Sequence, residues 1–113
     1  MRKNIGAGRE RMRLEDGREL RLLSALEVLQ ARREAEELAQ SERERALCSN
    51  ACLLSRALET QEGEPVFSSG REVLSGLRVE EIAALAGTWS RFNREENPGL
   101  TMEAEQVEDV KKN

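Results

Sequence analysis

Leucines recur at helical spacing early in the chain. Leu22, Leu26 and Leu29 stand four and three residues apart. Because an α-helix has about 3.6 residues per turn, this spacing puts all three on one face, which we expect to pack against a core. The pattern predicts a first helix between Gly17 and Gln40, whose second half is rich in charged residues.

The clearest amphipathic segment covers residues 42–59. Its apolar stripe steps at intervals of four, three and four residues: Leu47, Ala51, Leu54 and Leu58. Ser41 followed by Glu44 has the spacing of a capping box, in which side chains satisfy the free amides at a helix start. No Gly or Pro separates this segment from the preceding one. Residues 18–59 are therefore predicted to form either one long helix or two.

A turn and a short helix should follow. Gly63 permits left-handed backbone geometry and Pro65 cannot continue a helix, so the preceding helix is expected to end there. Phe67 then lies in an extended connector, and we expect its side chain to pack into the core. A second capping-box spacing begins at Ser69 and predicts a short helix over residues 71–75.

The last predicted helix covers residues 79–96. Its apolar stripe combines intervals of three and four residues: Ile82, Leu85, Ala86, Trp89 and Phe92. Pro98 should end it, because the residue before a proline avoids helical geometry. Strands beyond a short connector are not expected, since no β-branched alternation extends over four or more residues.

Three regions follow from these patterns. Residues 1–16 are expected to be a flexible basic arm, residues 17–98 a helical domain, and residues 99–113 a flexible acidic tail. A chain of 113 residues fits one domain. We therefore predict an all-α fold of three or four helices, with a long charged first helix and disordered tails.

Charge and hydropathy narrow the functional classes. The net charge of −4 argues against nucleic acid as a partner, which a basic surface would attract. No apolar run approaches the roughly 20 residues that span a bilayer, so we expect no membrane partner and a cytoplasmic location. Two cysteines are too few for a disulfide framework and agree with a reducing compartment.

Residues suited to catalysis are scarce. The chain has no histidine and no tyrosine, which removes the commonest general base and metal ligand. Adjacent carboxylates such as Glu80 and Glu81 diverge by about 100° on a helix rather than converging on a substrate. The segment Gly6-Ala7-Gly8 lacks the Lys-Ser/Thr of a phosphate-binding loop. We predict no catalytic residue, no metal ligand and no cofactor.

Cys48 and Cys52 stand four apart and share one helical face. A metal would need two further ligands, and no other cysteine or histidine is available. We expect both thiols to be buried structural residues. The alternative is an intermolecular disulfide or a redox-sensitive thiol, because a disulfide within one helix would be strained.

A helix-turn-helix is the alternative for residues 79–96. Ala83 and Gly87 have the spacing of that motif, and a turn at Gly87 would leave the following segment as a recognition helix. Asn93 stands where the motif has an apolar residue, and Glu95 would face phosphates. A continuous helix in which Gly87 allows close packing is therefore favoured over a DNA-binding regulator.

A series of motifs runs through the second half of the chain: Asn50-Ala51-Cys52-Leu53-Leu54, Gly63-Glu64-Pro65-Val66-Phe67-Ser68-Ser69, Glu72-Val73-Leu74, and Glu80-Glu81-Ile82 leading to Trp89, Asn93, Asn97 and Pro98. This order resembles small phage tail assembly chaperones and related proteins of tailed-phage morphogenesis modules. The resemblance covers about residues 47–98. In such families the small helical protein is thought to hold the tape-measure protein soluble while the tail tube assembles, often as an oligomer.

The resemblance implies a non-catalytic, protein-binding function. It implies a homo-oligomer in the cytoplasm of a bacterial host, with the tape-measure protein or another tail protein as partner. It also implies an apolar surface for a partner helix, built from six residues: Leu53, Leu54, Leu58, Phe67, Leu85 and Trp89. A core would use the same positions, so Trp89 is expected either to be buried or to anchor the partner.

Overall fold

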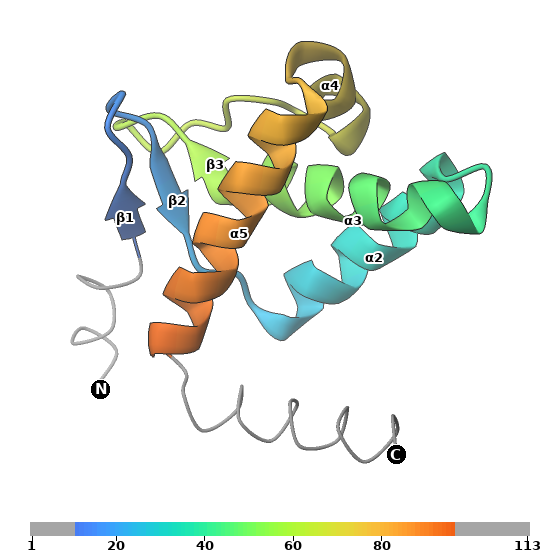
Figure 1. Ribbon diagram of the computed structural model, residues 1–113. Helices are drawn as coiled ribbons and strands as arrows, with labels where there is room; N and C mark the ends of the chain where they lie inside the picture. Colours follow the sequence, from blue (N-terminus) through green and yellow to red (C-terminus); the bar gives the residue numbers. More distant parts are fainter. Residues whose placement is uncertain (1–10, 97–113) are drawn as a thin grey trace.

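Four helices and a three-stranded antiparallel sheet make up residues 11–96, the part of the chain that the structure, a computed structural model, describes (Figure 1). In chain order the elements are β1 (Arg11–Arg13), β2 (Glu19–Arg21), α2 (Ala25–Leu38), α3 (Glu42–Ala57), β3 (Leu58–Glu59), α4 (Gly70–Gly76) and α5 (Val79–Glu96). Helices account for 64% of this part, so the fold is mostly helical. The all-α prediction is wrong in omitting the sheet.

The sheet begins with a hairpin between β1 and β2. Met12 lies opposite Leu20, and Gly17 in the connecting turn has a φ of +95°. Asp16-Gly17 is a dipeptide that favours such turns, so the sequence does carry a hairpin signal, although each strand has only three residues. Strand β3, at the end of α3, pairs with β2 and places Leu58 opposite Leu20, and both leucines are fully buried.

This hairpin corrects part of the prediction that residues 1–16 form a flexible basic arm. Residues 11–16 form β1 and the start of the turn, and Met12 and Leu14 are half-buried. A strand pairing between β1 and β2 holds this segment against the domain. Residues 1–10 of the expected arm, and residues 97–113 with the expected helix stop and acidic tail, lie outside the described residues.

Helix α2 starts at Ala25, later than expected, with a complete capping box. The hydroxyl of Ser24 accepts a hydrogen bond from the amide of Glu27, and the Glu27 carboxylate accepts one from the amide of Ser24. Three residues separate α2 from α3, where the amide of Gln40 donates to Glu44 Oε1 at 2.9 Å. The two helices are therefore separate.

The leucine face predicted to bury α2 is largely exposed instead. The exposed fraction is 59% for Leu26 and 46% for Leu29. The buried residues of α2 are Ala31 and Ala35, which pack against α3 beside its two cysteines. Small side chains let two helix backbones approach closely, and that contact turns the leucines outward. The prediction is wrong about which face of α2 packs.

Helix α3 is the element on which the others pack. It contacts α2, α4, α5 and the sheet. In Figure 1, α5 crosses the C-terminal end of α3, whereas α2 runs alongside α3 and away from α5. The predicted helix over residues 42–59 is confirmed as far as Ala57, and its last two residues form β3. The main core comprises Leu20, Ala51, Leu54, Ala57, Leu58, Val73, Ile82 and Trp89.

The two remaining helices follow the sequence pattern closely. The short helix expected over residues 71–75 is confirmed as α4, and the hydroxyl of Ser69 accepts from the amide of Glu72 as its spacing predicts. Helix α5 runs without a break through Gly87, so the turn that a helix-turn-helix requires is absent there. The expected close packing at Gly87 is also wrong, because a Cβ there would meet no neighbouring atom within 4 Å.

Replacing Gly87 by alanine should stabilise the protein. An alanine there finds open space, and it lowers the entropy of the unfolded chain, so the free energy of unfolding should rise by about 0.5–1 kcal/mol in urea titrations. Gly70→Ala is the contrasting variant, because its Cβ would lie against Cys52 Sγ and 3.1 Å from the Cys52 Cα. That variant should lose about 1–3 kcal/mol. Equal effects of the two changes would contradict this account.

Candidate functional site

A buried carboxylate joins the sheet to the helices. Glu59 in β3 is only 8% exposed and accepts hydrogen bonds from Arg11 Nη1 at 2.6 Å and Arg21 Nε at 2.9 Å. Arg21 also binds both oxygens of Glu27 at the start of α2, at 2.7 and 3.2 Å. The indole of Trp89 donates to the Arg21 carbonyl at 2.8 Å. This cluster ties the start of α2, and α5 through Trp89, to the sheet.

A second carboxylate joins three helices. Glu34 in α2 accepts from Arg56 Nη1 of α3 at 2.7 Å and from the amide of Gly70, at the start of α4, at 2.9 Å. Burial acts to raise the pKa of Glu34, but the hydrogen bonds from Arg56 and Gly70 outweigh it and the pKa is lowered. Glu34 therefore stays ionised and holds the rotation of α2 against α3.

The two cysteines lie in the contact between α2 and α3. Cys48 is 4% exposed and Cys52 is fully buried, and neither forms a disulfide. Burial, followed by the nearby charge of Glu34, raises the pKa of Cys52 to about 12. Burial also raises the pKa of Cys48. Because the thiolate is the reactive species, the structure favours structural thiols over the redox alternative.

An apolar hollow with large side chains on both walls lies between α2 and α5. Both helices pack on α3 yet hardly touch each other, which leaves a space of about 410 Å³ between them. We call this space the α2–α5 groove. It is lined by Leu23, Ala25, Val28, Leu29, Arg32, Trp89 and Asn93. Leu29 and the neighbouring Leu26 are two of the large apolar side chains that remain exposed, so the groove opens beside an apolar surface.

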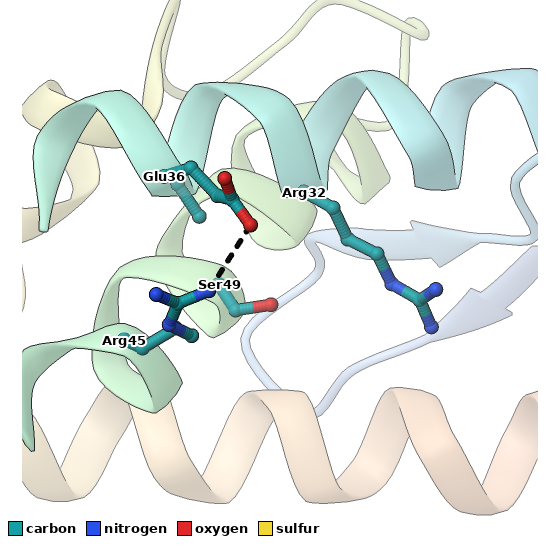
Figure 2. A pocket seen from close by; sticks show the side chains of 5 residues that line it. Arg32, Glu36, Arg45 and Ser49 are labelled. Atoms are coloured by element: carbon teal, nitrogen blue, oxygen red, sulfur yellow. Dashed lines mark hydrogen bonds and ion pairs between the residues drawn. The ribbon is translucent and has the colours of Figure 1, made fainter. Parts of the chain in front are cut away.

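A smaller pocket of about 220 Å³ lies between α2 and α3. Figure 2 shows Glu36 and Arg45 pointing toward one another, and their ion pair measures 3.0 Å. Arg32 lines this pocket as well as the α2–α5 groove, and its guanidinium lies apart from that ion pair in Figure 2. Arg32 thus stands at the junction of the two hollows.

The six residues expected to bind a partner do not form one surface. Leu54 and Leu58 are fully buried and Trp89 is 6% exposed, so all three belong to the core. The other three are half-buried and pack against that core: Leu53, Phe67 and Leu85. With few large apolar residues in the chain, folding consumes these positions. Among the six, Trp89 alone lines the α2–α5 groove.

The sequence predicts one core-facing register for the leucines of α2 and for the small residues after Gln30, Ala31 and Ala35 among them. In the structure the alanines are buried and Leu26 and Leu29 are exposed, so the groove beside Leu29 was not predicted. Ala31 and Ala35 stand four residues apart, and this spacing offers a second possible packing face on the same helix. Choosing between an alanine face and a leucine face requires knowing the partner helix. Cys48 and Cys52 of α3 pack against Ala31 and Ala35, so the alanine face of α2 is the buried one.

Other kinds of site find little support within residues 11–96. No group of three or more cysteine and acidic side chains in this range is arranged to hold a metal ion. Nor is any helix of the described range both long and apolar enough to cross a bilayer.

No known protein family, curated protein or solved structure matches this chain. Among the features of residues 11–96, the α2–α5 groove is the strongest candidate site.

Acid should weaken the fold through Glu27. Hydrogen bonds from Arg21 lower its pKa from 4.5 to about 2. A lowered folded-state pKa contributes stability that is present above pH 4.5 and is lost as the pH falls toward 2. We expect Glu27→Gln to remove part of the fall in unfolding free energy over that range, measured by urea titration. Glu37→Gln, on the exposed outer face of α2, is the control, and an equal effect there would contradict the assignment.

The thiols should resist modification in the folded protein. With a raised pKa and almost no exposure, Cys48 and Cys52 should react with iodoacetamide more than about a hundredfold more slowly than in urea, as followed by mass spectrometry. Rapid labelling under native conditions, or a disulfide-linked dimer on a non-reducing gel, would revive the redox alternative.

Proposed function

We propose that this chain is a non-catalytic protein-binding module whose α2–α5 groove takes a helical segment of a partner. The observation that carries the proposal is the groove itself, where Leu29 and Val28 on one wall face Trp89 on the other. A helix that lays its apolar side into such a groove is a recurring mode of peptide recognition.

The distribution of apolar side chains supports a binding role. Single exposed leucines are ordinary on protein surfaces, so neither Leu26 nor Leu29 alone would mean much. Here Leu29 lines a hollow that also contains Leu23 and Val28, and the exposed Leu26 lies three residues before Leu29 on α2. A continuous apolar area of this kind, next to an aromatic wall, is typical of interaction sites.

The role that fits best is that of a phage tail assembly chaperone or a similar virion morphogenesis protein. The motif order over residues 47–98 suggests it, and such a role requires a surface for an extended helical client rather than catalytic groups. The client would be a tape-measure or other tail protein, and the chaperone would act as a homo-oligomer in the host cytoplasm. A gene position beside a very long, helix-rich reading frame would support this assignment.

A designed peptide can test groove binding directly. We expect an amphipathic helical peptide, with leucines on one face and glutamines on the other, to change the emission of Trp89, which is the single tryptophan of the chain. Leu29→Gln should weaken binding by about tenfold, as expected for an apolar anchor worth about 1.4 kcal/mol. Fluorescence titration of Trp89 and anisotropy of a labelled peptide measure both effects.

Val79→Gln is the matched control. Val79 is the other large apolar residue with high exposure, at 62%, and it lies at the start of α5 away from the groove lining. Its substitution should leave peptide affinity unchanged. If the peptide fails to bind, or if both variants lose affinity equally, the groove is not the binding site. For the chaperone role, co-expression should keep the neighbouring long helical protein soluble, and Leu29→Gln should abolish that effect.

A further inference from the structure

Arg32 is a charged residue at the edge of the α2–α5 groove, and no acidic side chain within residues 11–96 pairs with it. Three glutamates of α2 are engaged by arginines from other elements: Glu27 by Arg21, Glu34 by Arg56 and Glu36 by Arg45. Arg32 is exposed, lines the groove, and makes no ion pair or hydrogen bond with another residue in the range 11–96. The next arginine, Arg33, is exposed and unpaired in the same way.

The charge of Arg32 lies on the same side of α2 as the apolar residues that line the groove. Arg32 follows Leu29 by three residues and Val28 by four, so all three share one side of α2. A rise of about 1.5 Å per residue puts the charge roughly one turn beyond these anchors. The remaining glutamate, Glu37, is exposed and does not line the groove.

We infer that the partner helix is acidic as well as amphipathic, with a carboxylate that pairs with Arg32. Its apolar residues fill the groove between Leu29 and Trp89, and the acidic residue stands three or four positions from one of them. This inference rests on the proposed function and adds the charge of the partner. The free guanidinium supplies the complementary charge, and arginine suits carboxylates because its planar head can bind both oxygens.

Three peptides separate the charge requirement from groove binding. All share the same leucine face, and their polar positions carry glutamate, glutamine or lysine. The chain is titrated with each while Trp89 emission is recorded. We expect the glutamate peptide to bind about fivefold tighter than the glutamine peptide, and the lysine peptide to bind weakest, with the difference shrinking at high salt.

Charge reversal assigns the effect to Arg32. Arg32→Glu should invert the order, so that the lysine peptide binds about tenfold tighter than the glutamate peptide. Arg43→Glu is the control, because Arg43 is exposed on the first turn of α3, has no ion pair within residues 11–96, and changes the net charge equally. It should leave the order unchanged. Circular dichroism checks that both variants fold.

The outcomes distinguish this inference from the function on which it rests. If the glutamine peptide binds but the order is the same with and without Arg32, the acidic partner is refuted and groove binding stands. If none of the three peptides changes Trp89 emission, the proposed function fails as well.

Two other binding partners for the Arg32 side chain would also overturn the inference. One is a second copy of the chain, in which case Arg32→Glu alone would shift the mass seen by light scattering from oligomer to monomer. The other is the chain's own acidic end. That end carries four carboxylates: Glu103, Glu105, Glu108 and Asp109. If they occupied Arg32, replacing them by amides would raise the affinity of the glutamate peptide, and would do so only while Arg32 is present. We expect neither change.

Discussion

The close contact between α2 and α3 is the constraint on which the rest of the structure depends. Ala31 and Ala35 meet the buried cysteines of α3, and only small side chains allow helices to lie so near each other. Once that face is committed, the rotation of α2 about its axis is set. Leu26 and Leu29 then turn to solvent, whereas Leu38 packs beside the alanines. The groove is a consequence of this packing.

Polar interactions hold the same arrangement at two points. Glu34 connects α2 to α3 and to the start of α4, while Glu59 gathers the arginines of the sheet and, through Arg21, the start of α2. Glu59 is buried and Glu34 is half-buried, and each accepts from more than one donor, so removing a donor would leave part of its charge uncompensated. Trp89 ties α5 to the sheet through its hydrogen bond to the Arg21 carbonyl.

This division of side chains explains how a small chain can keep a binding surface. Large apolar residues are few, and most of those in the second half, such as Leu54 and Ile82, are buried in the core around α3. The first half places its small residues in the contact between α2 and α3 and leaves Leu26 and Leu29 on the surface. An apolar wall, an aromatic wall and Arg32, which has no ion pair within residues 11–96, then meet in one groove, and this is the basis for proposing an acidic helical partner.

Most of the helices could be predicted from the sequence, because their apolar stripes, caps and stop signals act within a few residues. It predicted α3, α4 and α5 closely, and Asp16-Gly17 carries the turn signal of the hairpin. It could not determine the sheet as a whole, because β3 pairs with β2 across a long separation in the chain. Nor could it choose the buried face of α2, since alanines and leucines both recur at helical spacing. Only tertiary packing decided that choice, because the small side chains of α3 fit the alanines best, and the groove followed from it.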